Sequence, residues 1–181
     1  MRRYILAFAI GLLMAPLFAQ AQQAQVNTSK WKLYQNSEYG FEIRYPDTWR
    51  VNVSEGTTSP ASQPAQKTKV TMIDIRKPHG ENEPAAYLTI GIQQNQNPQK
   101  LSIGDYFAQQ FAKMNAKPEK NGTTTISGQP AIWMENTNSF GTDHGTFLLL
   151  HQTNLVSLDY RRQPGSDAIF SAIVSSFHIV N

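Results

Sequence analysis

The chain has 181 residues, no cysteine and a formal net charge of +3, from 16 basic and 13 acidic side chains. The lack of cysteine excludes disulfides, thiolate metal ligands, a cysteine nucleophile and the lipid-carrying cysteine of a bacterial lipoprotein. Arg2 and Arg3 lie within the first 21 residues, so the rest of the chain carries 14 basic and 13 acidic side chains, a net charge of +1, which argues against a nucleic-acid partner.

The first 21 residues are typical of a secretory signal peptide. Arg2 and Arg3 form a positive start, residues 4–18 form an apolar core that contains Pro16, and "AQA" ends the segment with small residues. This core is shorter than the roughly 20 residues that cross a bilayer. We therefore predict general secretion, cleavage after Ala21, and a periplasmic or secreted protein that is neither a lipoprotein nor inserted in the membrane after cleavage.

Residues 22–30 are polar and lack periodicity, which indicates a flexible leader, and residues 31–181 are expected to form a single domain. The segment "WKLYQ" is predicted to be a strand with Trp31 and Leu33 on one face. After a turn, "FEIRY" alternates in the same way, and Pro46 ends it because proline has no N–H for a strand ladder. The alternation resumes at Trp49.

The middle of the chain is read as a loop followed by two strands. Residues 54–66 are rich in Ser, Pro and Gln, which predicts a long loop. Residues 69–77 and 86–94 carry β-branched side chains in alternate and neighbouring positions, which is typical of strands at the centre of a sheet that is covered on both faces.

The rest of the chain alternates between helical and strand periods. Residues 102–117 have a helical apolar stripe, begin with a capping box of Ser102 and Asp105, and stop at Pro118. Two hairpins follow, at 120–138 with a turn at Gly128 and at 145–162 with a turn near 153–154. A last helix over 166–177 is expected to be capped by Ser166. Hairpin-linked strands with two helices predict the α+β class.

Three segments also resemble the PsbP-like family in the same order and with roughly the same spacing. They are "YQNSEYGFEIRYPDTW", "ISGQPAIW" and "IFSAIVSSFHIV". The resemblance covers nearly all of the chain from Trp31 and implies an antiparallel β-sheet sandwiched between helices (α/β/α). The best-known members of this family are extrinsic subunits of photosystem II. The bacterial-style signal and the missing lipid-carrying cysteine argue against that role here, and shared framework residues do not transfer function.

No catalytic motif is found in the sequence, and two clusters are the candidates for a divalent cation. In "PHGENEP", alternate residues His79, Glu81 and Glu83 offer an imidazole and two carboxylates. In "FGTDHGT", Asp143 and His144 lie between two glycines, where a hairpin is expected to reverse. Both clusters also have the composition of solvated turns, so the sequence predicts no obligate cofactor.

Aromatic residues of the predicted strands are either core residues or the lining of a ligand cleft. They are Trp31, Tyr39, Tyr45, Trp49 and Trp133. Their alternating spacing favours the core. For Trp49 in particular, we expect contact with the apolar stripe of the last helix, at Ile169, Phe170 and Ile173.

These observations favour an exported, soluble, non-enzymatic domain that acts by binding, or as an accessory factor to an envelope or membrane complex. The alternatives are a metal-assisted hydrolase with His79, Glu81 and Glu83 as ligands, and a protein that captures a small apolar ligand between sheet and helix. The basic pairs Arg76–Lys77 and Arg161–Arg162 are interpreted as solvated strand ends.

Overall fold

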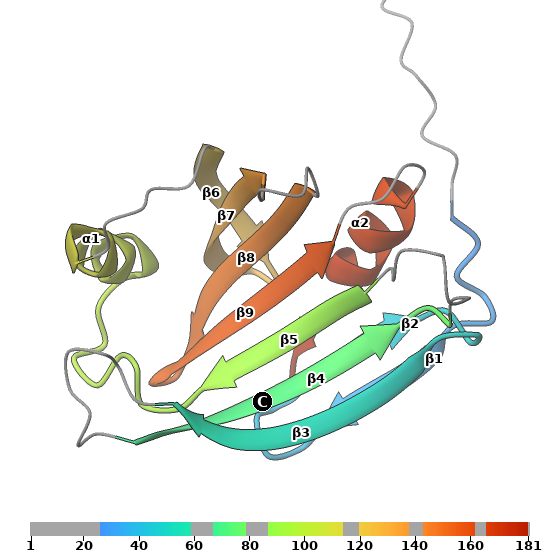
Figure 1. The fold of residues 1–181 in the computed structure, drawn as a ribbon, viewed down its shortest axis with the longest axis horizontal. Coiled ribbons are helices and arrows are strands. Elements are labelled where there is room, and N and C mark those ends of the chain that lie inside the picture. The colour runs from blue at the N-terminus through green and yellow to red at the C-terminus, as the bar shows by residue number, and fades with distance from the viewer. Residues whose placement is uncertain are drawn as a thin grey trace, which may run out of the picture.

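The computed structural model describes residues 26–58, 67–78, 87–113, 120–137, 143–161 and 166–180. Within these ranges the chain forms two antiparallel sheets and two helices (Figure 1). The predicted α+β class is confirmed. The signal peptide and its cleavage site, most of the leader, and His79, Glu81 and Glu83 lie outside the described residues. No helix of the described ranges is both long enough and apolar enough to cross a membrane.

The smaller sheet has the strand order β1-β2-β10. The predicted hairpin forms it, with β1 (Lys32–Asn36) antiparallel to β2 (Phe41–Tyr45), and β10 (His178–Ile179) pairs with the other edge of β2. The predicted strand is present, and Leu33 within it is 40% exposed. The neighbouring Tyr34 lies opposite Ile43 and packs against the ring of Phe41, 6.2 Å away, so the larger ring turns inward and Leu33 turns outward.

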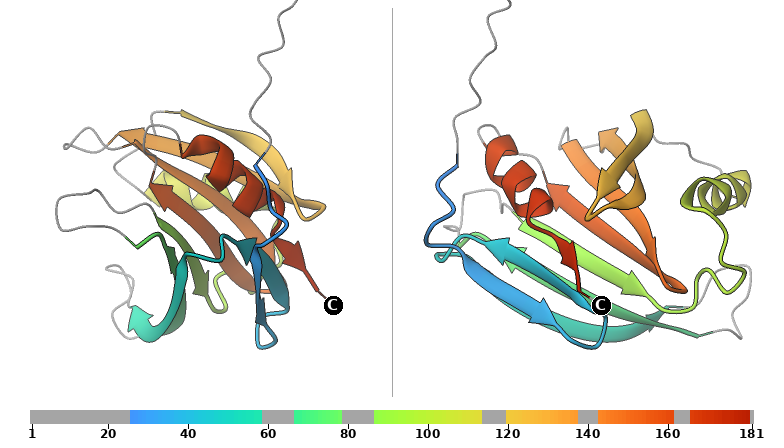
Figure 2. Two further views of the ribbon diagram at one scale, coloured as in Figure 1. Left: turned by 90° about the vertical axis from the view of Figure 1, so that its right-hand side faces the viewer. Right: turned by 180° about the vertical axis from the view of Figure 1, so that it is seen from behind.

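The larger sheet has seven strands in the order β3-β4-β5-β9-β8-β7-β6. Every neighbouring pair is antiparallel, and the sheet is strongly twisted (Figures 1 and 2). Its strands are β3 (Arg50–Thr58), β4 (Thr68–Arg76), β5 (Tyr87–Gln93), β6 (Lys120–Ile126), β7 (Gln129–Thr137), β8 (Asp143–His151) and β9 (Asn154–Arg161).

Two boundaries differ from the sequence prediction. Residues 54–58, expected in a loop, continue β3, because their backbone pairs with β4 as far as Thr58 opposite Thr68. Polar side chains suit this edge strand, where much of the surface faces water. Asp143 and His144, expected in a turn, instead begin β8 opposite Thr137 and Asn136.

The turn at Gly128 is confirmed, and its chemistry explains it. Ser127 and Gly128 have φ angles of 51° and 72° between Ile126 and Gln129. Two positive φ angles in a two-residue hairpin are the mark of a type I′ turn, which matches the twist of the flanking strands. The next hairpin turns at Gln152 and Thr153, one residue earlier than predicted, with Gln152 at a φ of 56°.

One face of the large sheet, here called the inner face, carries the main core. Figure 2 shows the small sheet and α2 (Asp167–Ser175) on this side. Side chains from both sheets and α2 are buried there. They include Phe41, Ile43, Ile73, Ile75, Leu88, Ile90, Leu158, Phe170 and Ile173, each at most 2% exposed. The small sheet therefore shares with α2 the layer that covers this face.

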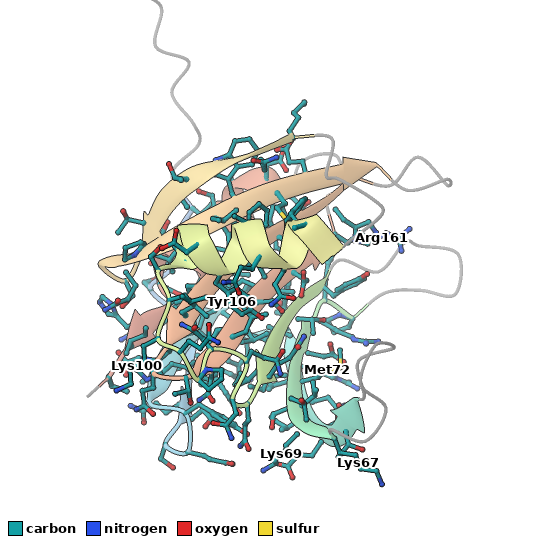
Figure 3. All side chains as sticks on the ribbon, turned by 90° about the vertical axis from the view of Figure 1, so that its left-hand side faces the viewer. Lys67, Lys69, Met72, Lys100, Tyr106 and Arg161 are labelled. Atoms are coloured by element: carbon teal, nitrogen blue, oxygen red, sulfur yellow. The ribbon has the colours of Figure 1, made fainter. Side chains whose placement is uncertain are left out.

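The opposite face, called the outer face, carries α1 (Ile103–Lys113), which lies in front of the sheet in Figure 3. Ser102 caps this helix as predicted, because the Asp105 N–H donates to Ser102 Oγ at 3.1 Å, and Ser102 Oγ donates in turn to the Asp105 carboxylate at 2.7 Å. Tyr106 is buried, 5% exposed, beneath the helix. The helix contacts β7 and β8, and Met72 on β4 remains 44% exposed, so β4 is not covered on both faces as predicted.

The start of α2 differs from that of α1. Ser166 occupies the N-cap position as predicted, but its side chain makes no capping hydrogen bond and its backbone is helical. The Phe170 N–H donates to the Ser166 carbonyl oxygen at 3.0 Å. The position of this helix start was therefore predictable, while the capping mechanism was not.

Candidate functional site

The metal candidates are not brought together in the described structure. His144 lies in β8, opposite Arg161 of β9, and the described residues hold no group of three or more His, Cys, Asp or Glu side chains that suits a metal ion. His79, Glu81 and Glu83 fall outside the described ranges, so a metal site in that segment stays a prediction.

The aromatic residues near the start of the domain serve the core. Trp49 is 6% exposed, and its indole meets the Phe170 ring edge-on, with ring centroids 5.8 Å apart and planes at 74°. This confirms the expected contact with the last helix. The buried hydroxyl of Tyr39 lies 2.9 Å from Thr71 Oγ1 and accepts a hydrogen bond from Gln94 at 3.1 Å. A buried ring with a satisfied hydroxyl is a framework feature.

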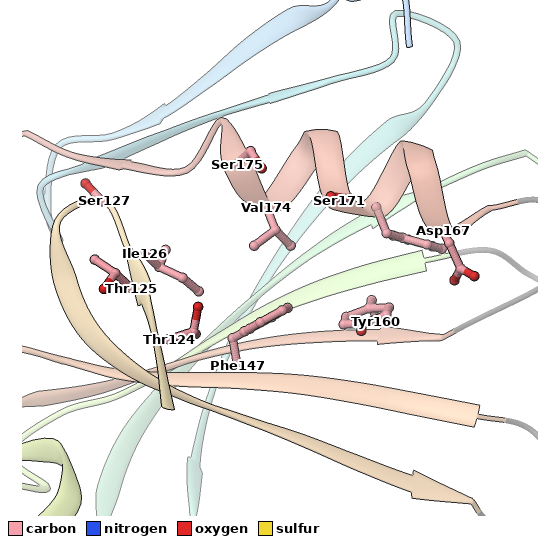
Figure 4. Close-up of a pocket in the computed structure, with 11 residues that line it drawn as sticks. Thr124, Thr125, Ile126, Ser127, Phe147, Tyr160, Asp167, Ser171, Val174 and Ser175 are labelled. Atoms are coloured by element: carbon pink, nitrogen blue, oxygen red, sulfur yellow. The ribbon is translucent and has the colours of Figure 1, made fainter. Parts of the chain in front are cut away.

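A groove lies between α2 and the inner face of the large sheet (Figure 4). Its volume is about 650 Å³, which is within the range of roughly 300–1,000 Å³ found for small-molecule sites. The lining comes from β6, β8, β9 and α2. It comprises Thr124, Thr125, Ile126, Ser127, Phe147, Tyr160, Asp167, Phe170, Ser171, Val174 and Ser175.

The floor of the groove is an aromatic platform. The rings of Phe147 and Tyr160 have centroids 5.9 Å apart and planes inclined by only 21°, and Tyr160 is also 5.5 Å from Phe170. Tyr160 can lie flat because Gly145, its cross-strand partner on β8, has no side chain. A Cβ atom at Gly145 would overlap the Tyr160 ring.

The same arrangement recurs on the next strands. Trp133 lies opposite Gly122, and a Cβ atom at Gly122 would approach the indole nitrogen to 2.6 Å. Trp133 in turn lies opposite Phe147. Glycine in a strand often marks the close approach of another group. Here two glycines let aromatic rings lie against the sheet.

The walls are polar and carry little charge. Hydroxyl groups line them on both sides: Thr124, Thr125 and Ser127 on the β6 side, and Ser171 and Ser175 on the α2 side. Among the described residues of the lining, Asp167 at the start of α2 is the one carboxylate, and none is His, Lys or Arg. Serine and threonine hydroxyls can both donate and accept hydrogen bonds, and they are weak nucleophiles without an adjacent base.

The sequence predicted one lining residue, Phe170, as a core contact of Trp49, and predicted none as part of a ligand site. The groove joins residues from positions 124 to 175, and its shape depends on how α2 lies across the sheet. The signal available in the sequence was the pair of glycines within strands that otherwise alternate. Without the strand register, these glycines could not be matched to the rings that lie on them.

Several titrating groups outside the groove have shifted pKa values. Burial lowers the pKa of His151 at the end of β8. At the junction of the two sheets, Lys69 donates to Glu38 and contacts Glu55, both at 3.1 Å. The hydrogen bond between Lys69 and Glu38 raises the pKa of Lys69 and lowers that of Glu38. Both carboxylates are more than half exposed, so this ion-pair network contributes little to stability.

Comparison with known proteins relates the fold to a solved structure. No protein-family model matches the sequence, and no curated protein matches it. The structure is similar to the solution structure of the cyanobacterial PsbP (CyanoP) from Synechocystis sp. PCC 6803. The TM-score is 0.56, with 85% of this chain and 95% of the other covered and 15% of the residues identical. This similarity shows a PsbP-like fold. At this identity it carries no function.

Proposed function

We propose that the protein is an exported, non-enzymatic domain that acts by binding, and that the groove between α2 and the large sheet is its binding site. The groove itself is the observation that carries this proposal. The core beside it is closed, with Leu158 and Ile173 at 0% exposure, whereas the Phe147–Tyr160 platform faces an open volume. An aromatic surface left open beside a packed core suits a ligand.

The chemistry of the lining favours a small amphipathic ligand. A flat apolar group would lie on the rings of Phe147 and Tyr160, and hydroxyl or amine groups at its edge would meet the side chains of Ser171, Thr124 and Asp167. The aromatic floor supplies most of the buried area, and the polar groups orient the ligand. This differs from the purely apolar ligand considered from the sequence, because the walls carry hydroxyl groups.

A neutral fluorescent amphiphile tests the site. N-phenyl-1-naphthylamine, whose emission rises in apolar surroundings, is titrated into the wild type and into Ser171→Trp, which places an indole in the groove from an exposed position of α2. We expect saturable binding to the wild type and at least tenfold weaker binding to the variant. The matched control is Gln109→Trp, an exposed position of α1 on the other side of the sheet, and it should bind like the wild type.

Two results would count against the proposal. One is the absence of saturable binding to the wild type. The other is equal binding by Ser171→Trp and Gln109→Trp, because the probe would then lie elsewhere. Melting curves of both variants are recorded first, so that a loss of binding is not confused with a loss of folded protein.

The proposal includes an accessory role at an envelope or membrane complex. Ligand binding would either regulate the attachment of the protein to that complex or hold the protein there. The absence of a catalytic motif in the sequence and the PsbP-like fold support it. Crosslinking in intact cells, followed by identification of the attached proteins, tests this part. Attachment of no specific envelope protein would contradict it and would leave the ligand proposal standing.

A further inference from the structure

The large sheet brings three arginines into one row on its outer face. Arg50 pairs with Arg76, and Arg76 pairs with Tyr87. On the other side of β5, Arg161 of β9 pairs with His144 of β8. Because Leu88 pairs with Tyr160, Tyr87 and Arg161 occupy the same rung on neighbouring strands. We call Arg50, Arg76 and Arg161 the arginine row.

The row lies on the outer face because the adjacent residues Ile75, Leu88 and Tyr160 point into the core. Neighbouring strands are about 4.8 Å apart, so Arg50 and Arg76 are one strand apart and Arg76 and Arg161 are two. Long guanidinium side chains at this spacing can reach a common ligand above Tyr87. In Figure 3, Arg161 lies beyond one end of α1, on the side of the sheet that faces the viewer.

The charges of the row are only partly neutralised. Arg76 Nη2 contacts Asp74 at 2.9 Å, and its guanidinium lies 5.8 Å from the centroid of the Tyr87 ring. A second carboxylate on the strands of this face, Asp159, accepts from Thr146 at 2.7 Å and from Ser157 at 2.8 Å. No ion pair of Arg50 or Arg161 is present among the described residues, and within that part of the chain the positive charge of the row exceeds the negative charge paired with it.

One nitrogen of the Arg161 guanidinium is buried without a hydrogen-bond acceptor among the described residues. This nitrogen is Nε. Buried N–H groups are almost always paired, and a guanidinium donates in a fixed fork that matches the oxygens of phosphate and carboxylate groups. Asp74 and Asp159, which the described strands place on this face, are engaged by other groups, and an external oxyanion is an acceptor that fits.

We infer that the arginine row binds a phosphate-type oxyanion, with Arg161 and Arg76 on either side of Tyr87 and with Arg50 adding charge at the edge. This site lies on the outer face, whereas the groove lies on the inner face. The inference is therefore independent of the proposed function. The sequence separates these arginines among β3, β4 and β9, and only the strand order assembles them.

Calorimetric titration of the full chain with inorganic phosphate tests the site at low ionic strength. We expect a dissociation constant below about 1 mM, and at least a tenfold loss in Arg161→Gln. Arg50→Gln, at an exposed position, should weaken binding by a smaller factor without affecting folding. Arg44→Gln is the matched control, because Arg44 is an exposed arginine of β2 in the other sheet, and it should bind like the wild type.

Vesicles separate the two sources of such a group. Phosphatidylglycerol vesicles are compared with phosphatidylcholine vesicles in a flotation assay with the same variants. Arginine-dependent flotation with the anionic vesicles alone assigns the site to a lipid headgroup, and arginine-dependent binding of inorganic phosphate alone assigns it to a soluble phosphate. Binding of neither, or binding that Arg161→Gln and Arg44→Gln reduce equally, overturns the inference.

Discussion

Replacing Gly145 with alanine tests how the groove floor is built. A Cβ atom there would overlap three atoms of the Tyr160 side chain, the ring carbons Cζ and Cε1 and the hydroxyl oxygen Oη. The ring is packed against Phe147 and Phe170, so it cannot move without disturbing both. Overpacking of this kind costs about 1–3 kcal/mol. For a domain of this size, at roughly 2–4 °C per kcal/mol, the melting temperature should fall by several degrees.

Gly56→Ala is the matched control, because a Cβ atom at Gly56 meets nothing within 4 Å. Its melting temperature should stay the same or rise slightly, since alanine restricts the unfolded chain. Thermal unfolding followed by circular dichroism measures both variants. In a Tyr160→Ala background the overlap is gone, so Gly145→Ala should no longer be destabilising. Equal melting of Gly145→Ala and Gly56→Ala, or an undiminished loss in the Tyr160→Ala background, would refute this reasoning.

Three further predictions follow from the structure and the sequence. Trp49→Ala should lower the free energy of unfolding, measured in urea, by about 3–5 kcal/mol, and Trp49→Phe should lower it by much less. If Trp49→Ala instead lost ligand binding without losing stability, the core role of Trp49 would be contradicted. Because burial lowers the pKa of His151, the unfolded state binds the proton more readily, so the free energy of unfolding should fall as the pH drops below about 6.5. The free energy of unfolding of His151→Gln should fall less over the same pH range. Identical pH profiles for the wild type and the variant would contradict a role of His151 in this pH dependence. Elemental analysis of protein purified without chelator should find metal well below one equivalent, and a full equivalent that disappears on replacing His79, Glu81 and Glu83 with alanine would instead support the metal-assisted hydrolase.

The sequence was most informative where one physical rule dominates. Period-two alternation located β2, where Phe41 and Ile43 are buried, and β-branched side chains in alternate and neighbouring positions located β4 and β5. The turn at Gly128 was predictable because few residues other than glycine accept a positive φ readily. The contact between Trp49 and Phe170 was predictable because a large ring after a strand must be covered by the apolar face of a helix.

The sequence was misleading where partners far along the chain decide the outcome. The polar run 54–58 reads as a loop, yet β4 pairs with it and makes it a strand. Leu33 belongs to the alternation of β1, but the register with β2 turns Tyr34 inward instead. The groove depends on Gly145 lying opposite Tyr160, a relation set by the register of β8 and β9. Local patterns carry no information on register between distant strands.

The location of a bound ligand tests the central claim most directly. N-phenyl-1-naphthylamine is titrated into isotopically labelled protein, and the chemical shifts of backbone amides and aromatic side chains are followed by NMR. We predict that the largest changes fall on the groove residues of β6 and α2 and on the rings of Phe147 and Tyr160, with little change at Met72 on the outer face. Changes centred on the outer face, or spread evenly over both faces, would contradict the account.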